Sequence, residues 1–227
     1  MHALHEVIRC RGCLGAMDDR AQAGLCGRCW SLLTRLPEER CPLCALGHGW
    51  GEGCPDPVAW TWGEALWDYH GGLGALLVPA IKRGELGWMD ALLGRAGRVP
   101  LPGWTAGFSL VCNAPTARLR RWYRGFDLAE RAAWMFAGRL GTPCRQVLRK
   151  PLYTRAQAGL PQGRRRRMGP HVTLEPGASV EGEAVLLVDD VWTTGTTLLR
   201  CAQALGAAGA RDVAVLALFR AGKRGGR

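Results

Sequence analysis

The chain has no long apolar run. A membrane-spanning helix needs about 20 consecutive apolar residues, and the best stretch, residues 73–81, is short and interrupted by Pro79. Residues 1–9 contain His and Glu without an apolar run, so no secretory signal is visible and we expect a cytoplasmic protein. A Walker A loop is also missing, because no Gly-Lys-Thr or Gly-Lys-Ser follows a glycine at the required spacing.

Acidic residues are scarce relative to basic ones. The sequence has 30 Lys and Arg against 19 Asp and Glu, which gives a formal charge of +11. Such an excess favours an anionic partner, either nucleic acid or a polyphosphate substrate, without distinguishing them. With 227 residues, of which 48% are hydrophobic, the chain can form one α/β domain and a small appendage.

Cysteines are concentrated at the N-terminus, where seven of the ten fall within the first 54 residues. In a reducing compartment, Cys-x-x-Cys spacing indicates a metal site rather than disulfides. Two such knuckles complete a closed tetrahedral zinc site, and a third knuckle is followed by one further cysteine. A second zinc would need another ligand, for which His48 and Asp56 are nearest, and crosswise pairing of the knuckles stays open. The expected ligands of one or two structural Zn2+ ions are Cys10, Cys13, Cys26, Cys29, Cys41, Cys44 and Cys54.

Residues 1–58 are predicted to form this cysteine-rich zinc-ribbon module. The segment is rich in Gly and Pro and has too little apolar material to fold unaided, so metal is expected to stabilise it. The alternative is a ribbon that docks nucleic acid or a partner. Aromatic side chains could either stack on bases or pack a domain junction. These are Trp30, Trp50, Trp60, Trp62 and Trp67.

Residues 59–220 are predicted to form an α/β domain. Apolar runs at 108–112, 184–188 and 213–219 indicate strands. Apolar residues at helical spacing, starting at residues 76 and 128, indicate helices. Strands that alternate with helices favour a parallel sheet flanked by helices. Residues 221–227 are Gly-rich and basic, and we expect this tail to be disordered.

One stretch combines features that a structural turn does not need. Residues 184–188 form the expected buried strand, Asp189 and Asp190 follow, and Gly195 lies in a threonine-rich loop before a helix. A helix cap needs one Asp or Thr, not this whole series. The carboxyl end of a parallel strand and the N-terminus of the next helix are suited to a sugar phosphate. The hydroxyl donors are Thr193, Thr194, Thr196 and Thr197.

This stretch resembles the phosphoribosyl-pyrophosphate (PRPP) loop of type I phosphoribosyltransferases. The resemblance implies that Asp189 and Asp190 hold the ribose hydroxyls and that residues 193–197 surround the 5′-phosphate. It also implies a type I phosphoribosyltransferase-like parallel sheet and Mg2+ bound with PRPP.

Further motifs resemble the competence protein F family. Besides the cysteine knuckles, they include Asn113-Ala114-Pro115, Arg124-Gly125-Phe126-Asp127, residues 154–160 and the arginines at 164–167. Members of that family are cytosolic phosphoribosyltransferase-like proteins with an N-terminal zinc finger, implicated in uptake of transforming DNA. Asp127 and Met168 stand where the family usually has Asn.

In related transferases, pyrophosphate leaves C1 of PRPP and a base nitrogen takes its place. Cations must neutralise the departing charge. For this the resemblance nominates Arg120, Arg121, Arg124 and Lys82, with Tyr69 as a weaker neighbour and Gln157 and Arg165 on a flap.

The sequence therefore supports two main functional hypotheses. The first is a phosphoribosyltransferase, a pentosyl-group glycosyltransferase that acts on an unidentified base or amine. The second is a non-catalytic competence factor that binds single-stranded DNA and competence proteins, and uses the PRPP fold as a scaffold or sensor. The intact loop favours the first and the net charge of +11 favours the second. A zinc-ribbon RNA binder is less favoured, because the cysteine module lacks a clear basic helix.

Overall fold

The computed structural model describes residues 9–17, 24–47, 54, 58–70, 72–117, 122–150 and 172–222. Its helices are α1 (Gly27–Trp30), α2 (Gly74–Lys82), α3 (Leu86–Ala96), the 3-10 helix η2 (Gly103–Gly107), α5 (Leu128–Leu140) and α8 (Thr196–Ala207). Its strands are β1 (Trp62–Asp68), β2 (Leu110–Asn113), β3 (Leu148–Arg149), β4 (Thr173–Leu174), β5 (Ala184–Trp192) and β6 (Asp212–Arg220).

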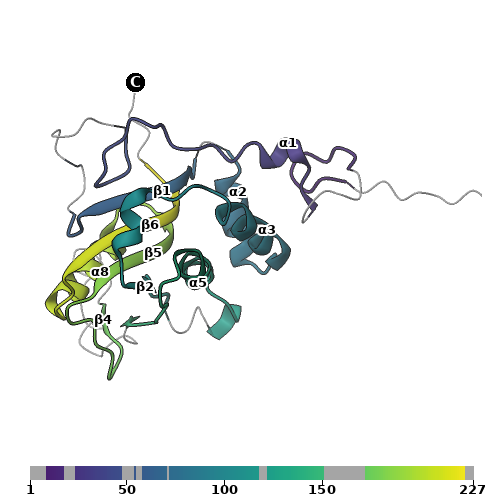
Figure 1. Cartoon of the computed structure of the whole chain (residues 1–227). Coiled ribbons are helices and arrows are strands. Elements are labelled where there is room, and N and C mark those ends of the chain that lie inside the picture. The colour runs from purple at the N-terminus through teal and green to yellow at the C-terminus, as the bar shows by residue number, and fades with distance from the viewer. Residues whose placement is uncertain are drawn as a thin grey trace, which may run out of the picture.

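A parallel sheet forms the centre of the chain (Figure 1). Its strand order is β1-β6-β5-β2, and every neighbouring pair is parallel. β3 and β4 form a separate antiparallel pair. The central strands β5 and β6 are buried along most of their length, as expected of parallel strands that are covered on both faces. The predicted fold class, a parallel sheet flanked by helices, is confirmed.

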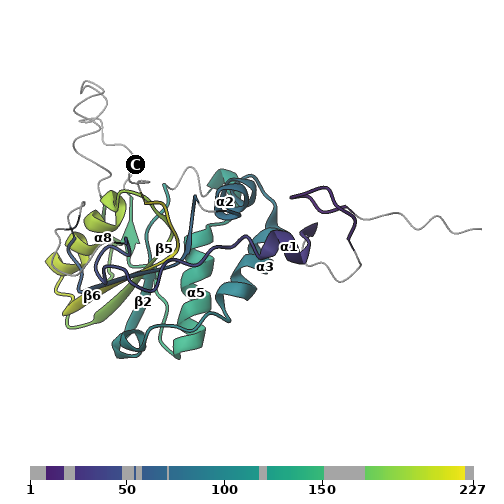
Figure 2. The ribbon, with the colours of Figure 1, turned by 90° about the horizontal axis from the view of Figure 1, so that it is seen from above.

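Helices cover both faces of this sheet (Figure 2). One face packs against α2, α3 and α5, through buried side chains such as Ile81, Leu92 and Phe136. The other face packs against α8, whose buried side chains are Leu198, Cys201, Ala202 and Leu205. Since the sheet lies between the helices, its strand ends are the places where polar side chains can gather.

Two of the longer elements, β1 and α3, were not predicted from the sequence. β1 contains Trp62 and Trp67, which the sequence reading assigned only to base stacking or junction packing. α3 buries Trp88, Met89, Leu92 and Ala96 at helical spacing, so the signal for this helix was present in the sequence. β5 also extends to Trp192, beyond the predicted 184–188. Because of this added length, Asp189 and Asp190 are among the last residues of a regular strand.

The cysteine-rich segment packs on both faces of the sheet. The first pair of knuckles joins the α3 side, where Arg11 pairs with Glu85 and the Arg95 guanidinium lies 4.0 Å from the centre of the Trp30 ring. The third knuckle joins the α8 side, next to Trp60 and Trp192. Trp30, Trp60 and Trp67 are all buried, so they pack the junction instead of stacking on bases. Trp50 lies outside the described residues.

Residues of the same segment cover the free edge of β1. The amide of Asp68 donates to the carbonyl of Thr34 at 2.9 Å, and the amide of Gly63 donates to the carbonyl of Pro42 at 2.7 Å. An uncovered edge strand would present unpaired backbone groups to other chains. A Cβ at Gly63 would lie 2.3 Å from the carbonyl oxygen of Leu43, so this close approach requires glycine.

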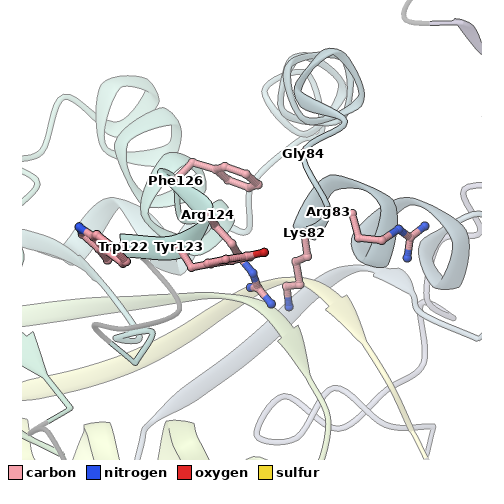
Figure 3. Close-up of a pocket in the computed structure, with 7 residues that line it drawn as sticks. All are labelled: Lys82, Arg83, Gly84, Trp122, Tyr123, Arg124 and Phe126. Carbon is pink, nitrogen blue, oxygen red and sulfur yellow. The ribbon is translucent and has the colours of Figure 1, made fainter.

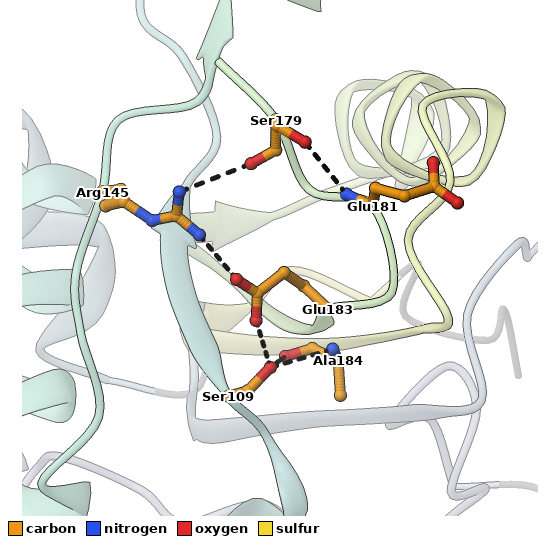
Figure 4. Close-up of polar contacts among 6 residues, drawn as sticks. All are labelled: Ser109, Arg145, Ser179, Glu181, Glu183 and Ala184. Carbon is orange, nitrogen blue, oxygen red and sulfur yellow. Dashed lines mark hydrogen bonds and ion pairs between the residues drawn. The ribbon is translucent and has the colours of Figure 1, made fainter.

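Polar contacts join the amino ends of β2 and β5 (Figure 4). Arg145 Nη2 lies 2.8 Å from Glu183 Oε1, and Ser109 Oγ donates to the other oxygen of the same carboxylate. The amide of Ala184 donates to Ser109 Oγ at 3.1 Å. These contacts fix the two strands at the end of the sheet opposite to the Asp189–Asp190 motif. Among the described residues, no helix is long and apolar enough to cross a membrane.

Candidate functional site

Asp189 and Asp190 lie near the carboxyl end of β5, where backbone hydrogen bonds orient both side chains. The amide of Asp190 donates to Asp189 Oδ1 at 2.9 Å, and the amide of Val191 donates to Asp190 Oδ1 at 2.7 Å. Both residues are partly buried, because β5 continues to Trp192 and β6 pairs beside it.

The threonine loop connects β5 to α8. Gly195 has φ of 72°, a left-handed conformation that favours glycine, and a Cβ there would lie 2.9 Å from Trp192 Nε1. Thr194 Oγ1 and Thr196 Oγ1 share a hydrogen bond of 2.9 Å. α8 begins at Thr196, and the first backbone N–H groups of a helix have no partner within the helix. Such a helix start is suited to bind an anion.

A cavity of about 450 Å³ brings most of the predicted site residues together. Lys82, at the end of α2, places its Nζ 2.6 Å from Asp190 Oδ2. The predicted residues that line the cavity are Asp189, Asp190, Thr193, Thr197, Lys82 and Arg124. Thr194, Gly195 and Thr196 belong to the same loop but do not line it, and Arg120, Arg121, Gln157 and Arg165 lie outside the described residues.

Lys150 also lines this cavity, and sequence reasoning missed it. It follows the short strand β3, which ends at Arg149. A lysine that follows Arg149 in a short basic stretch gives no signal, because only the pairing of β3 with β4 brings it to this end of the sheet. Tyr69 lines a neighbouring cavity of about 490 Å³ together with Lys82 and Asp190, and its ring packs on Phe219.

The environment raises the pKa of Asp189 to about 8. Burial is the largest cause, and the negative charge of Asp190 adds to it. The amide of Asp190 and the positive charges of Lys150 and Lys82 act in the opposite direction. Asp189 therefore retains its proton near neutral pH in the free protein.

Asp127 has a structural role at the start of α5. It is the N-cap, and its Oδ1 accepts hydrogen bonds from the amides of Ala129 at 3.0 Å and Glu130 at 3.5 Å. A carboxylate at this position satisfies amides that have no partner within the helix and lies at the favourable end of the helix dipole. The carboxylate of Asp127 therefore stabilises the start of α5, although the residue also lines the cavity of about 450 Å³.

The cysteines form two clusters that have the chemistry of metal sites. The Sγ atoms of Cys10, Cys13, Cys26 and Cys29 lie within 4.8 Å of one another, as do those of Cys41, Cys44 and Cys54. The Sγ atoms of Cys10 and Cys29 are 3.5 Å apart, and those of Cys13 and Cys26 are 3.7 Å apart. A tetrahedral site with Zn–S bonds of ~2.3 Å has sulfur–sulfur edges of ~3.8 Å. The first two knuckles therefore pair with each other, and the crosswise arrangement is not adopted.

Within the first cluster, hydrogen bonds favour the thiolate form of Cys10, whereas burial and the neighbouring thiols raise the pKa of Cys29. Burial opposes ionisation of Cys10, but the amides of Cys26 and Gly12 donate to its Sγ, and the net result lowers its pKa to about 6. A thiolate is the form that binds metal. Both candidates for a fourth ligand of the second cluster, His48 and Asp56, lie outside the described residues.

Arg220 connects the second cysteine cluster to the threonine loop. This residue ends β6 and is 1% exposed. Its Nε donates to the carbonyl of Cys44 at 2.8 Å, and its Nη1 donates to the carbonyls of Trp192, at 3.0 Å, and Thr193. The guanidinium also lies 4.6 Å from the centre of the Trp192 ring. Sequence reasoning missed Arg220, because a basic residue beside a basic tail looks like surface charge.

Comparison with known proteins places the candidate loop in a recognised domain. Residues 156–227, which include β5, α8 and β6, match the family model described as "Phosphoribosyl transferase domain". No curated protein matches the sequence.

Solved structures with a related arrangement include enzymes of different lengths. The glutamine phosphoribosylpyrophosphate (PRPP) amidotransferase from B. subtilis shares 25% identity over 57% of this chain and 25% of its own, with a TM-score of 0.37. The APRTase from Giardia lamblia shares 20% identity over 63% of this chain and 71% of its own, with a TM-score of 0.36. The purine phosphoribosyltransferase from Pyrococcus horikoshii shares 17% identity over 58% and 79%, with a TM-score of 0.34.

This chain spans about a quarter of the length of that amidotransferase. Its parallel sheet is flanked by helices, and the matched segment supplies two adjacent strands of the sheet with the helix between them. The chain therefore contains a phosphoribosyltransferase-like domain whose paired acids and threonine loop lie at the carboxyl end of β5.

Proposed function

We propose that the chain binds PRPP and transfers its phosphoribosyl group to a nitrogen acceptor. The observation that carries this proposal is the polar cavity of about 450 Å³, whose lining includes three acids, three threonines and three cations. Carboxylates accept hydrogen bonds from sugar hydroxyls, whereas cations and helix N-termini bind phosphate. PRPP carries both sugar hydroxyls and phosphate groups, so one molecule can make all of these contacts.

The division of roles follows from the position of each residue. Asp189 and Asp190 accept hydrogen bonds from the ribose 2′- and 3′-hydroxyls, and the loop at 193–197 with the start of α8 binds the 5′-phosphate. Lys82, Arg124 and Lys150 bind the diphosphate. In the free protein Lys82 is held by Asp190, with 2.6 Å between Nζ and Oδ2. PRPP binding therefore exchanges an internal ion pair for contacts from both partners to the substrate.

The residues present also fit a magnesium ion. Mg2+ prefers oxygen ligands and is commonly held by one or two carboxylates together with substrate phosphates. Asp127 of the cavity lining caps α5, so Asp189 and Asp190 are the carboxylates that would hold the ion with PRPP, where its charge would offset that of the diphosphate.

The chemical step requires stabilisation of a leaving group. As the bond between C1 and the diphosphate oxygen breaks, negative charge develops on the diphosphate. Lys82, Arg124 and Lys150 are already positioned around the cavity, so they can stabilise this charge without reorganisation. The partly buried setting of the paired acids strengthens such electrostatic interactions relative to water.

For the cysteine clusters we propose structural zinc. The four thiols of the first cluster fit a closed tetrahedral site, and the three thiols of the second would need one more ligand. Metal analysis of freshly reduced protein should return one or two zinc ions per chain.

The first test is calorimetric titration of the protein with PRPP and Mg2+. Replacing Asp189 and Asp190 by Asn should weaken binding about ten- to a hundredfold, because a hydrogen bond to a charged group contributes about 1.5–3 kcal/mol. The matched control is Asp212→Asn, which removes a carboxylate at the opposite end of the sheet. Equal PRPP affinity in the double variant and the parent would contradict the proposal.

A role in DNA uptake is the second candidate. The resemblance to the competence protein F family suggests it, and the formal charge of +11 supports an interaction with single-stranded DNA. The basic clusters at 164–167 and 223–227 lie outside the described residues. Adding single-stranded DNA to the titration separates the candidates. DNA that binds without altering PRPP affinity indicates two independent sites, whereas DNA binding without PRPP binding favours a non-catalytic factor.

A further inference from the structure

A second cavity, of about 800 Å³, lies beside the polar one. It opens between the end of α2, at residues 82–84, and the segment 122–126 that precedes α5 (Figure 3). Lys82, Arg124 and Phe126 line both cavities. Since these three side chains form a shared wall, a ligand in the second cavity would lie next to a substrate in the first.

Aromatic and cationic side chains dominate this second cavity. The aromatic ones are Trp122, Tyr123 and Phe126, and the cationic ones are Lys82, Arg83 and Arg124. In Figure 3 the Lys82 and Arg124 side chains run side by side toward the strand ends, and the Tyr123 hydroxyl turns toward them. The Phe126 ring faces the same gap, whereas Trp122 and Arg83 lie at its two outer ends.

The exposure of the aromatic side chains indicates a ligand that stacks. Trp122 is 82% exposed and Tyr123 is 87% exposed, although large aromatic side chains are normally buried to a high degree. Planar rings bind to such side chains by stacking, and this interaction tolerates different ring systems. The cavity therefore fits a planar ring better than a flexible aliphatic amine.

The charges of the lining indicate what the ring carries. No acidic side chain is among the described residues that line the cavity, and three cations are. Among these described lining residues, a ring amino group would find no carboxylate to accept its hydrogen bonds. A ring carboxylate would meet the Arg and Lys side chains, which bind carboxylates through charge-assisted hydrogen bonds.

We propose that this cavity is the acceptor site and that the acceptor is a planar heteroaromatic carboxylate. The proposal rests on the proposed function, because the acceptor must lie beside C1 of PRPP. The lone pair of a pyridine-type ring nitrogen forms the new bond to C1, and the C1–O bond breaks with its electron pair on the departing diphosphate. No proton moves in this step. If the attacking ring nitrogen instead carries a hydrogen, that proton is released to water.

The test compares pairs of rings that differ in charge. Nicotinate and nicotinamide share one ring, as do orotate and uracil. With PRPP and Mg2+ bound, nicotinate and orotate should each bind at least tenfold more tightly than the neutral partner, measured by calorimetry. A neutral ring that binds as tightly as its charged partner, or carboxylates that show no binding at millimolar concentration, would overturn the proposal.

Variants identify where the ring binds. Tyr123→Ala and Trp122→Ala should weaken nicotinate binding about five- to a hundredfold, the range expected for loss of one stacking contact, and leave PRPP affinity unchanged. Trp134→Ala is the matched control, because Trp134 is 58% exposed on α5 and does not line the cavity. Arg83→Gln should weaken nicotinate but not nicotinamide binding. Unchanged nicotinate affinity in Tyr123→Ala and Trp122→Ala would contradict the placement.

The design separates failure of this proposal from failure of the proposed function. If PRPP binds but no ring does, the acceptor assignment is wrong and PRPP binding stands. If PRPP does not bind, the proposed function is wrong, and this acceptor assignment fails with it. A third outcome is that nicotinate does not bind, whereas oligothymidylate binds to the parent and not to Tyr123→Ala. This outcome would assign the second cavity, with its aromatic side chains, to nucleic acid instead.

Discussion

Protonation of Asp189 makes the stability of the free protein depend on pH. Its pKa is raised to about 8, first by burial and then by the charge of Asp190. A carboxyl group whose folded-state pKa lies above its unfolded value favours the folded state only while it is protonated. Its contribution is complete below about pH 4, the unfolded pKa, and is lost as the pH rises through about 8.

Asp189→Asn should remove this pH dependence. In the absence of PRPP and Mg2+, the variant should become progressively more stable than the parent as the pH rises from 4 to 8. A difference of about 1 kcal/mol corresponds to about 2–4 °C in Tm for a chain of this size, and we expect the gap to widen by at least that amount. Differential scanning calorimetry across this range checks it, with Asp212→Asn as the control for loss of a carboxylate. A constant difference in Tm would show that Asp189 titrates normally.

The strand β1 depends on a segment that precedes it by about 20–30 residues in the chain. Residues 34–43 cover its free edge, and Gly63 allows the Leu43 carbonyl to approach closely. A Cβ at Gly63 would lie 2.3 Å from that carbonyl oxygen and 2.8 Å from Cη2 of Trp192. Neither a backbone carbonyl nor a buried indole can move aside easily, since protein interiors are close-packed.

Gly63→Ala should therefore destabilise the protein by about 1–3 kcal/mol, the usual cost of overpacking. Gly138→Ala is the matched control, because Gly138 lies in α5 and, apart from its chain neighbours and the backbone of its own helix, nothing lies within 4 Å of the added Cβ. Alanine is favoured over glycine in a helix by about 1 kcal/mol, so the control should be stabilised. Thermal unfolding of both variants measures the two effects. Shifts in Tm of the same sign would disprove the close approach at Gly63.

At the scale of the whole molecule, the two cysteine clusters are attached to different parts of the domain. The first packs on the α3 side, and the second packs on the α8 side beside Trp60 and Trp192. Arg220 links only the second cluster to the threonine loop, through the carbonyls of Cys44 and Thr193. Loss of the proposed metal ion from the second cluster should therefore disturb the proposed PRPP site, whereas loss from the first should not.

Cys44→Ser and Cys13→Ser provide the comparison. Each variant should lose one zinc ion per chain, as measured by metal analysis. Amide hydrogen exchange at residues 192–196 should accelerate only in Cys44→Ser, because the carbonyl that orients Arg220 is displaced there. PRPP affinity should fall with it. If both variants left exchange in the loop unchanged, Arg220 would not transmit the state of the cluster.

Local sequence patterns were sufficient to predict the fold class, much of the central sheet and the nature of the loop. The continuous apolar run of β5 and the helical spacing of α8 reflect burial on fixed faces, which depends on period and composition alone. The threonine loop was visible because its chemistry lies within nine consecutive residues, Asp189 to Thr197. Cys-x-x-Cys spacing likewise indicated two ligands at once, but only the structure decided which knuckles share a cluster.

Only the tertiary structure determined which distant residues meet. Lys150 enters the polar cavity because β3 pairs with β4, and Arg220 reaches the loop because β6 pairs with β5. The aromatic cavity likewise forms where the end of α2 meets residues 122–126, which lie about 40 residues later in the chain. Such contacts depend on the order and register of strands. The sequence by itself determined where buried strands, turns and thiolate pairs occur, because these follow from local composition; the three-dimensional packing decided which charges and rings share a cavity, because that depends on contacts between residues far apart in the chain.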